Sequence, residues 1–203
     1  MVIFLETARL TLRRFTDADA DDLCALDADP AVMRFLTGGS PTPCDVIRRE
    51  ILPRFLRSYE AGAGYGYWAA IVRATGAFAG WFGLRPAGAP ASGEAELGYR
   101  LRQALWGQGY ATEGARALID AGFAGAGLRR IVATTYQDNL ASRRVMEKAG
   151  LIFVRSFRLT AEELAAPGTY QVSAPALWDG NDVEYALTRE AWARGQHEDR
   201  GVS

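Results

Sequence analysis

The chain has 203 residues, of which 49% are apolar, and this is enough for one domain with a substantial core. Its 23 basic and 24 acidic residues are mixed along the sequence and give a net charge of −1, which argues against a nucleic-acid or membrane-surface footprint. No run approaches the roughly 18 apolar residues of a membrane span, and residues 1–6 lack the length and basic flank of a signal peptide.

Metal and thiol chemistry have little support. Cys24 and Cys44 are the only cysteines, and His197 is the only histidine. So few ligands argue against a zinc site and against a Ser-His-Asp or Cys-His mechanism. We expect both cysteines to be free thiols in a reducing cytosol, with Cys24 as a small core residue. The chain is therefore expected to be cytoplasmic and metal-free.

The first part of the chain predicts one strand and two helices. Residues 9–15 alternate apolar and polar side chains, as a half-buried strand does. A helix capped at residues 16–17 follows and reaches its limit at Pro30. Pro43 opens a second helix, and Pro53 within it predicts a kink or break.

Three strands are expected next. Residues 66–72 and 77–84 flank the turn at 74–76 and predict a hairpin. Residues 86–93 form an Ala/Gly/Pro loop that is too short to separate domains. Residues 94–101 alternate in the period-2 pattern of a strand with one buried face.

A glycine-rich stretch, Trp106-Gly107-Gln108-Gly109-Tyr110-Ala111-Thr112-Glu113, joins that strand to a helix. A helix N-terminus offers about four unpaired N–H groups and a partial positive charge, and glycine lets a phosphate approach them. We predict a phosphate cradle, with a plain strand-to-helix turn as the alternative. Thr112 stands where a dinucleotide fingerprint needs glycine, and no Gly-Lys-Ser/Thr occurs, which counts against NAD or ATP.

The second half predicts a β-branched strand at residues 130–136, followed by a helix that begins near Asn139. A further strand runs to about Leu159. The connection over residues 160–182 has no clear pattern, and its length is typical of a functional or mobile loop. A final strand over 183–188 ends the sheet.

The order of these motifs resembles the GCN5-related N-acetyltransferase (GNAT) superfamily. The resemblance covers roughly residues 9–153 and returns at 183–192, and it is closest to the ribosomal-protein-alanine N-acetyltransferase-like (RimJ/RimL-type) branch. It rests on the glycine turn after a strand and on Asn139-x-x-Ser142 followed by Glu147-Lys148-Ala149-Gly150-Leu151-Ile152-Phe153. Two departures are Trp106, where many members carry Gln or Arg, and the extra Ile152 before Phe153.

The resemblance implies an α/β (α+β) fold. This fold has a central mixed, mostly antiparallel twisted sheet of six to seven strands, splayed between the fourth and fifth strands and flanked by about four helices. Residues 1–194 would form a single N-acetyltransferase domain. Ordered structure is expected to end near Trp192, with residues 195–203 as a disordered tail.

The implied activity is acetyl-CoA-dependent transfer to a primary amine, either a protein N-terminal α-amine or a small-molecule amine. Transfer would be direct, in a ternary complex, without metal, nucleic acid or membrane, and a homodimer is plausible. The residues expected to bind acetyl-CoA are Tyr99, Leu101, Gly107, Gln108, Gly109, Tyr110, Ala111, Thr112 and Asn139. Asn139 is equally suited to capping its helix.

Glu96 matches the Glu of the branch's Glu-hydrophobic-Gly-Tyr pattern and is the candidate general base, directly or through a water. A merely solvated carboxylate is as consistent with its position. Ser142 is the candidate hydrogen-bond donor to the leaving thiolate, with Tyr136 as the second choice. For Ser142, ordinary first-turn helix chemistry is the alternative.

The acceptor side is less defined. Arg34, Phe35 and Tyr59 are candidate acceptor contacts, although ordinary packing or solvated surface explains each of them as well. A non-catalytic acyl-CoA sensor or partner-binding module is the alternative function, since it would keep the phosphate cradle without the acceptor chemistry.

Overall fold

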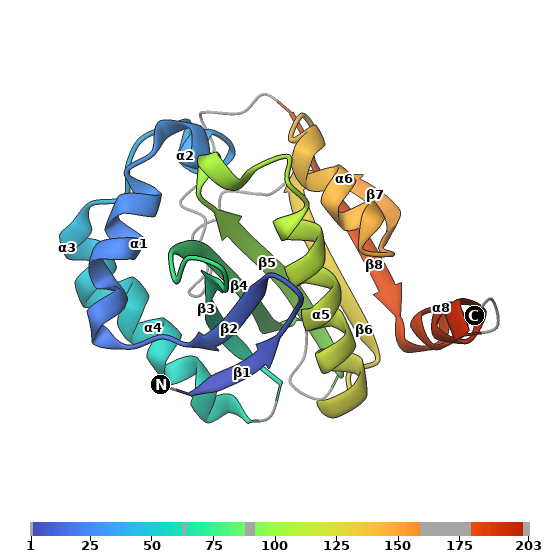
Figure 1. Ribbon diagram of the computed structural model, residues 1–203. Coiled ribbons are helices and arrows are strands. Elements are labelled where there is room, and N and C mark those ends of the chain that lie inside the picture. Colours follow the sequence, from blue (N-terminus) through green and yellow to red (C-terminus); the bar gives the residue numbers. More distant parts are fainter. Residues whose placement is uncertain (1, 63, 88–91, 159–179, 201–203) are drawn as a thin grey trace.

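The computed structural model describes residues 2–62, 64–87, 92–158 and 180–200, and these fold around one twisted sheet with helices on both faces (Figure 1). Within the described residues the sheet has eight strands in the order β1-β2-β3-β4-β5-β6-β8-β7. The strands are β1 (Ile3–Glu6), β2 (Leu10–Arg14), β3 (Gly66–Val72), β4 (Phe78–Ala87), β5 (Glu94–Leu101), β6 (Arg130–Tyr136), β7 (Ile152–Phe157) and β8 (Asp182–Thr188). The predicted fold class is confirmed, with β1 as a strand that the sequence pattern did not predict.

The sheet is splayed at its only parallel pairing among the described strands. β5 and β6 are in register only from Glu94 opposite Arg130 to Glu96 opposite Val132. Every other neighbouring pair is antiparallel. Beyond Glu96 the two strands part, so the predicted splay between the central strands is confirmed.

Alternating side chains of β3 and β4 divide the core into two layers, because successive residues of a strand point to opposite faces. Tyr67 and Trp81 pack in the core with Leu23, from the helices that precede β3. Trp68 and Phe82 pack in the other core, under the helices that follow β5.

The first layer contains α1 (Ala20–Asp27), α2 (Pro30–Thr37), α3 (Cys44–Val46) and α4 (Leu52–Arg57). Pro30 begins α2 rather than closing a longer helix, and Asp29 caps it by accepting a 2.9 Å hydrogen bond from the Ala31 N–H. Proline suits this position because the first helical N–H has no intrahelical partner. The irregularity expected near Pro53 is a π-helical turn over Ile47–Ile51, immediately before α4.

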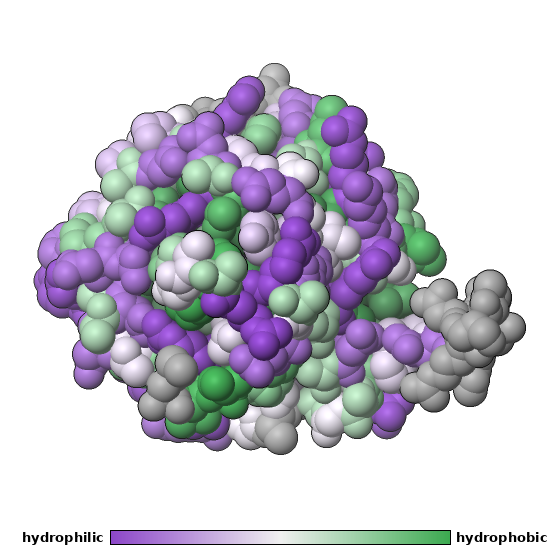
Figure 2. Space-filling model, in the orientation of Figure 1, coloured by the Kyte–Doolittle hydropathy of each residue, from purple (hydrophilic) through white to green (hydrophobic). Residues whose placement is uncertain are grey.

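The second layer contains α5 (Tyr110–Gly125) and α6 (Leu140–Lys148), and α8 (Arg189–Arg200) follows β8. α5 approaches the sheet closely at Gly114, where an added Cβ would lie 2.3 Å from the Phe82 ring. The outward surfaces of α5 and α6 are mainly hydrophilic (Figure 2). α8 continues past Trp192 to Arg200, so helix replaces the expected disorder over residues 195–200.

Cys24 in α1 and Cys44 in α3 are joined by a disulfide, with their Cα atoms 5.2 Å apart. The expectation of two free thiols was therefore wrong. Pairing two distant cysteines depends on how α1 and α3 pack, which spacing along the chain does not indicate. No helix within the described ranges is both long and apolar enough to cross a bilayer. The connection expected over residues 160–182 falls, as far as residue 179, outside the described residues.

Candidate active site

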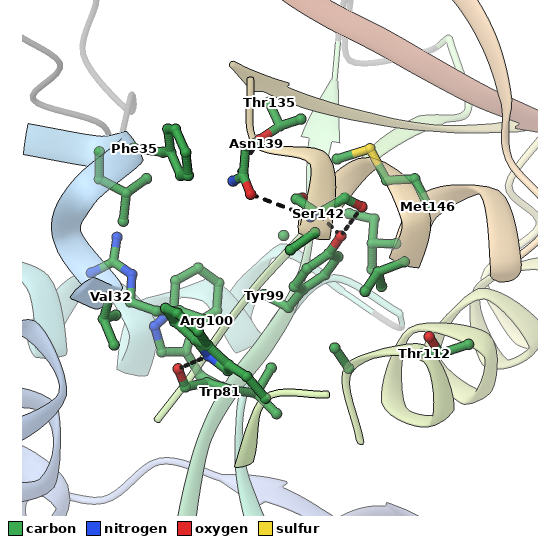
Figure 3. A pocket seen from close by; sticks show the side chains of 18 of the residues that line it. Val32, Phe35, Trp81, Tyr99, Arg100, Thr112, Thr135, Asn139, Ser142 and Met146 are labelled. Carbon is green, nitrogen blue, oxygen red and sulfur yellow. Dashed lines mark hydrogen bonds between the residues drawn. The ribbon is translucent and has the colours of Figure 1, made fainter. Parts of the chain in front are cut away.

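A cavity of about 700 Å³ lies where β5 and β6 part (Figure 3). Both layers and the sheet contribute to its wall. Residues around it include Val32, Phe35, Trp81, Glu96, Tyr99, Arg100, Leu101, Gly107, Gly109, Ala111, Thr112, Asn139, Ser142 and Met146. The cavity thus connects the glycine turn before α5 with the opened edge of β5 and with α2.

The glycine turn presents main-chain donors to this cavity. Gly107 and Gly109 have φ angles of 73° and 83°, a left-handed conformation that favours glycine. The N-cap residue of α5 is Gly109, which has no side chain to cap the helix, whereas Asp29 caps α2 and Asn139 caps α6. A Cβ on Gly107 would meet no atom within 4 Å. The first-turn N–H groups therefore fit an anionic group such as a pyrophosphate.

Arg9 supports this turn from outside the cavity. Its Nη1 donates to the Gln108 carbonyl at 2.9 Å, its Nε pairs with Glu113 at 2.6 Å, and its guanidinium lies 4.4 Å from the centre of the Tyr110 ring. Burial alone would raise the pKa of Glu113, but hydrogen bonds from Thr7 and Arg9 outweigh it and lower the pKa. Gln108 and Tyr110 are not among the residues that line the cavity, and the Gln108 Nε2 donates to the Ala104 carbonyl at 2.8 Å.

Among the described residues, no strand pairs with the β6-facing edge of β5 beyond Glu96. Tyr99 and Leu101 lie in this part of the strand and line the cavity. The Leu101 carbonyl accepts a 2.9 Å hydrogen bond from the Trp106 Nε1, which ties the strand end to the glycine turn. An extended ligand could hydrogen-bond to the remaining main-chain groups as an added strand does.

Glu96 lines the cavity and is already engaged on both carboxylate oxygens. Its Oε2 lies 2.7 Å from Arg85 Nη2, and its Oε1 accepts a 3.2 Å hydrogen bond from the Thr134 hydroxyl. Burial alone would lower the pKa of Arg85, but the Glu96 carboxylate outweighs it and raises the pKa. Arg85 was not predicted from the sequence, although β4 and β5 pair Arg85 directly with Glu96. The register of the two strands could have identified it.

Ser142 and Asn139 come from the first turn of α6. The Asn139 Oδ1 accepts a 3.3 Å hydrogen bond from the Ser142 N–H, and its Nδ2 donates to the Thr135 hydroxyl at 3.1 Å. The capping role of Asn139 is therefore realised. The Ser142 Oγ lies 3.0 Å from the Tyr99 hydroxyl, which reaches it from β5 across the splay (Figure 3).

The remaining candidate site residues either line the cavity or pack outside it. Arg34 and Phe35 line the cavity. Tyr136 is not among the lining residues, and its ring stacks on Phe35 with centroids 6.2 Å apart. Tyr59 accepts a 2.9 Å hydrogen bond from the Phe15 N–H and donates to the Tyr67 carbonyl, and burial raises its pKa to about 12. Tyr59 therefore packs beneath the cavity wall and does not line it.

Arg100, another lining residue that was not predicted from the sequence, forms a buried ion pair with Asp27 of α1. Their side chains are 5% and 1% exposed. This pair links β5 to the helical layer that carries Phe35. Alternation along β5 predicts Arg100 on the polar face with Glu96, but its burial against α1 could not be derived from the strand alone.

A family model described as an acetyltransferase (GNAT) domain matches residues 9–152. The chain belongs to the GNAT family and is an acetyltransferase, and this family uses acetyl-CoA. The narrower assignment to the RimJ/RimL-type branch is not established by this match. Within the described residues no group of three or more His, Cys, Asp or Glu side chains could hold a metal ion.

Several relatives share this description. The chain is 32% identical over 199 residues to the FsC-acetyl coenzyme A-N(2)-transacetylase of Aspergillus fumigatus, covering 95% of this chain and 79% of that protein. It is 32% identical to an uncharacterized N-acetyltransferase, p20, of Bacillus licheniformis, covering 73% and 84% of the two chains.

Solved structures share the fold. A GNAT-family acetyltransferase from Bacillus anthracis superposes with a TM-score of 0.73 at 23% identity, covering 94% of this chain and 99% of that one. Aminoglycoside acetyltransferase AAC(6')-Ib, solved with coenzyme A and kanamycin, gives a TM-score of 0.68 at 18% identity, covering 92% and 99%.

Proposed function

We propose that the protein transfers the acetyl group of acetyl-CoA directly to a primary α-amine, in a ternary complex and without a covalent enzyme intermediate. The observation that carries this proposal is the continuity of the cavity. It connects the uncapped N-terminus of α5 with the Glu96 carboxylate and with α2. Donor and acceptor can therefore meet in one site, as direct transfer requires.

The donor would lie along main-chain groups. The pyrophosphate would bind the N–H groups of residues 107–112, and the pantetheine arm would follow the open edge of β5 at Tyr99 and Leu101. Asn139 would flank the arm from α6. The two left-handed glycines and the absence of a side-chain cap among the described residues support this arrangement.

The reaction needs neither a strong general base nor a strong general acid. An α-amine has a pKa of about 7.7 to 8.0, so part of it is neutral at pH 7, and a thiol pKa of about 8.5 makes the thiolate a good leaving group. Glu96, directly or through a water, would take the proton that the amine loses. Ser142 would donate a hydrogen bond to the thiolate, with Tyr136 as a second choice because its ring lies outside the cavity wall.

For the acceptor we favour a small molecule with an α-amine. The Aspergillus fumigatus relative is named for transfer to an N(2) position, and its similarity extends over 95% of this chain. A protein N-terminus, the acceptor that the RimJ/RimL-type branch would imply, is the second candidate. A homodimer remains part of this proposal, as does a cytoplasmic location, which no longer has free thiols to support it because Cys24 and Cys44 form a disulfide.

Calorimetric titration with acetyl-CoA, with NAD and ATP as controls, tests the donor site first. Thiol release is then followed over a panel of small α-amines and N-terminal peptides. Gly107→Glu places a charge in the cradle, where a Cβ meets no atom within 4 Å, and should abolish both binding and turnover. Gly76→Glu, the same change at a left-handed glycine in the turn between β3 and β4, should affect neither, because it carries the same backbone strain and a Cβ there meets no atom within 4 Å.

Two outcomes would count against the proposal. Unchanged acetyl-CoA turnover in Gly107→Glu would remove the cradle from the mechanism. Tight acetyl-CoA binding without thiol release across the whole panel would favour the acyl-CoA-binding module instead.

A further inference from the structure

The Tyr99 side chain joins the two elements that the splay separates. Tyr99 belongs to the part of β5 beyond its pairing with β6, and its ring reaches toward the first turn of α6 (Figure 3). Its hydroxyl donates to the Ser142 carbonyl at 3.1 Å and lies 3.0 Å from the Ser142 Oγ, where either oxygen can be the donor. Both side chains line the cavity. The pair is therefore placed beside any ligand that lies along the open edge of β5.

We propose that Tyr99 is a positioning residue for the Ser142 hydroxyl. When its single phenol proton turns from the Ser142 carbonyl to the Ser142 Oγ, the proton of Ser142 is left directed into the cavity. This inference rests on the proposed function, in which that proton meets the sulfur of the departing thiolate.

Hydroxyl geometry explains why a second group is needed. A serine hydroxyl has one proton and rotates freely, and a serine in the first turn of a helix readily donates to nearby main-chain carbonyls instead. When a second group donates a hydrogen bond to the serine oxygen, fewer orientations remain for the serine proton. That bond also strengthens the outgoing hydrogen bond, because linked hydrogen bonds polarise one another.

The proton balance needs no further reactant. The carbon–sulfur bond breaks with its electron pair going to sulfur, while a carbon–nitrogen bond forms. Tyr99 and Ser142 keep their protons and contribute hydrogen bonds only. The proton lost by the amine equals the one that the thiolate finally takes up.

Tyr99 is suited to act as a lasting donor. Burial raises its pKa, and the hydrogen bond with Ser142 opposes this rise only in part. The phenol therefore keeps its proton through neutral and mildly alkaline pH. Its ring also contacts Phe82, with centroids 6.1 Å apart, and this packing fixes its direction.

The test compares Tyr99→Phe with Tyr185→Phe. Tyr185 is a matched control because its hydroxyl also bonds to α6, through Arg143 and Glu147 at 3.0 Å each, but it does not line the cavity. With the best amine of the panel, Tyr99→Phe should lower kcat about fivefold, the effect of one lost hydrogen bond between neutral groups, with the KM for acetyl-CoA unchanged. Tyr185→Phe should change neither. In the Ser142→Ala background, Tyr99→Phe should have no further effect on kcat.

A second readout needs no acceptor. Binding of CoA, with its free thiol, is titrated from pH 6 to pH 9.5, and acetyl-CoA serves as the control without a thiol. A thiolate stabilised by Ser142 makes CoA binding tighten with pH, and both Tyr99→Phe and Ser142→Ala should flatten that dependence. Thermal melting confirms that each variant is folded.

The outcomes separate this inference from the proposed function. If the wild-type protein releases no thiol with any amine, the proposed function fails, while the CoA titration still tests the Tyr99–Ser142 pair. If the wild-type protein turns over but Tyr99→Phe matches Tyr185→Phe in kcat and in the CoA titration, the positioning role is overturned. An added loss from Tyr99→Phe in the Ser142→Ala background would also overturn it.

Discussion

Arg9 and Glu113 form a 2.6 Å ion pair that fixes the start of β2 to the first turn of α5. The same guanidinium donates to the Gln108 carbonyl and does not line the cavity, so it stabilises the glycine turn from outside the cavity. Glu113 also accepts a 2.6 Å hydrogen bond from the Thr7 hydroxyl. The shape of the proposed phosphate cradle therefore depends on residues outside it, at the beginning of the domain.

Replacing Arg9 by glutamine should weaken donor binding without changing the chemical step. Loss of its hydrogen bond to the Gln108 carbonyl loosens the turn, and we expect the KM for acetyl-CoA to rise about fivefold with kcat nearly constant. Arg73→Gln is the control, since Arg73 is similarly exposed and bonds the Thr7 carbonyl but not the turn. Equal KM values for the two variants in steady-state kinetics would contradict this role of Arg9.

Glu96→Gln should reduce kcat by about a hundredfold near pH 7 if the carboxylate accepts the amine proton. The defect should shrink toward pH 9, because an α-amine above its pKa is neutral without help. The pH profiles of both proteins measure this convergence. If kcat of the variant is lowered by the same factor at every pH, Glu96 has a structural role, which it fulfils through its contacts with Arg85 and Thr134.

The buried pair of Asp27 and Arg100 should matter for stability. Asp27→Ala leaves a buried guanidinium without this carboxylate, and such changes cost about 3 to 5 kcal/mol in the free energy of unfolding. Asp22→Ala is the control, because Asp22 and Arg102 pair at 2.7 Å with side chains 43% and 40% exposed. Exposed pairs contribute about 1 kcal/mol or less. Urea unfolding measures the free energy of unfolding of both variants. Similar losses of stability in Asp27→Ala and Asp22→Ala would contradict this prediction.

Acid should destabilise the protein partly through Asp19. Burial alone would raise the pKa of Asp19, but the hydrogen bonds from Arg13 and Thr16 outweigh it and lower the pKa. A lowered folded-state pKa means that this stabilisation is complete above the ordinary value of about 3.9 and is lost as the pH falls through the folded value. Asp19→Asn should therefore be less stable than the wild type at pH 7, with the gap narrowing by pH 3. A constant gap in urea unfolding would argue against this linkage.

The Cys24–Cys44 bond predicts that the purified, non-reduced protein has no titratable thiol. Closing a loop of 20 residues stabilises a domain by about 3 kcal/mol in the chain-entropy model. Cys44→Ser, or full reduction, should lower the melting temperature by several degrees. Two reactive thiols in the non-reduced protein would restore the original expectation.

Local patterns identified most of the fold. The period-2 alternation of residues 94–101 and the β-branched run at 130–136 matched β5 and β6 at both ends. The short strand β1 was missed because Ile3–Glu6 has too few residues to show alternation and depends on pairing with β2. Pro30 was read as a helix end although it is equally suited to a helix start.

The site was predictable where main chain or a motif defines it, as at Gly107 and Gly109. It was not predictable where distant elements meet. Arg85 beside Glu96, Arg9 behind the glycine turn and Tyr99 against Ser142 are contacts between residues 11 to 104 positions apart. Such contacts follow from strand register and layer packing, which a single stretch of sequence does not encode.

The division of the cavity between main chain and side chains has an evolutionary consequence. In the proposed function, peptide groups of β5 and of the glycine turn hold most of the acyl donor. Amino-acid substitutions rarely remove such main-chain groups. The acceptor end is walled by the side chains of residues such as Arg34, Phe35 and Glu96, and each can be exchanged in one step. Drift at these positions would therefore change which amine is modified while leaving the source of the acetyl group unchanged.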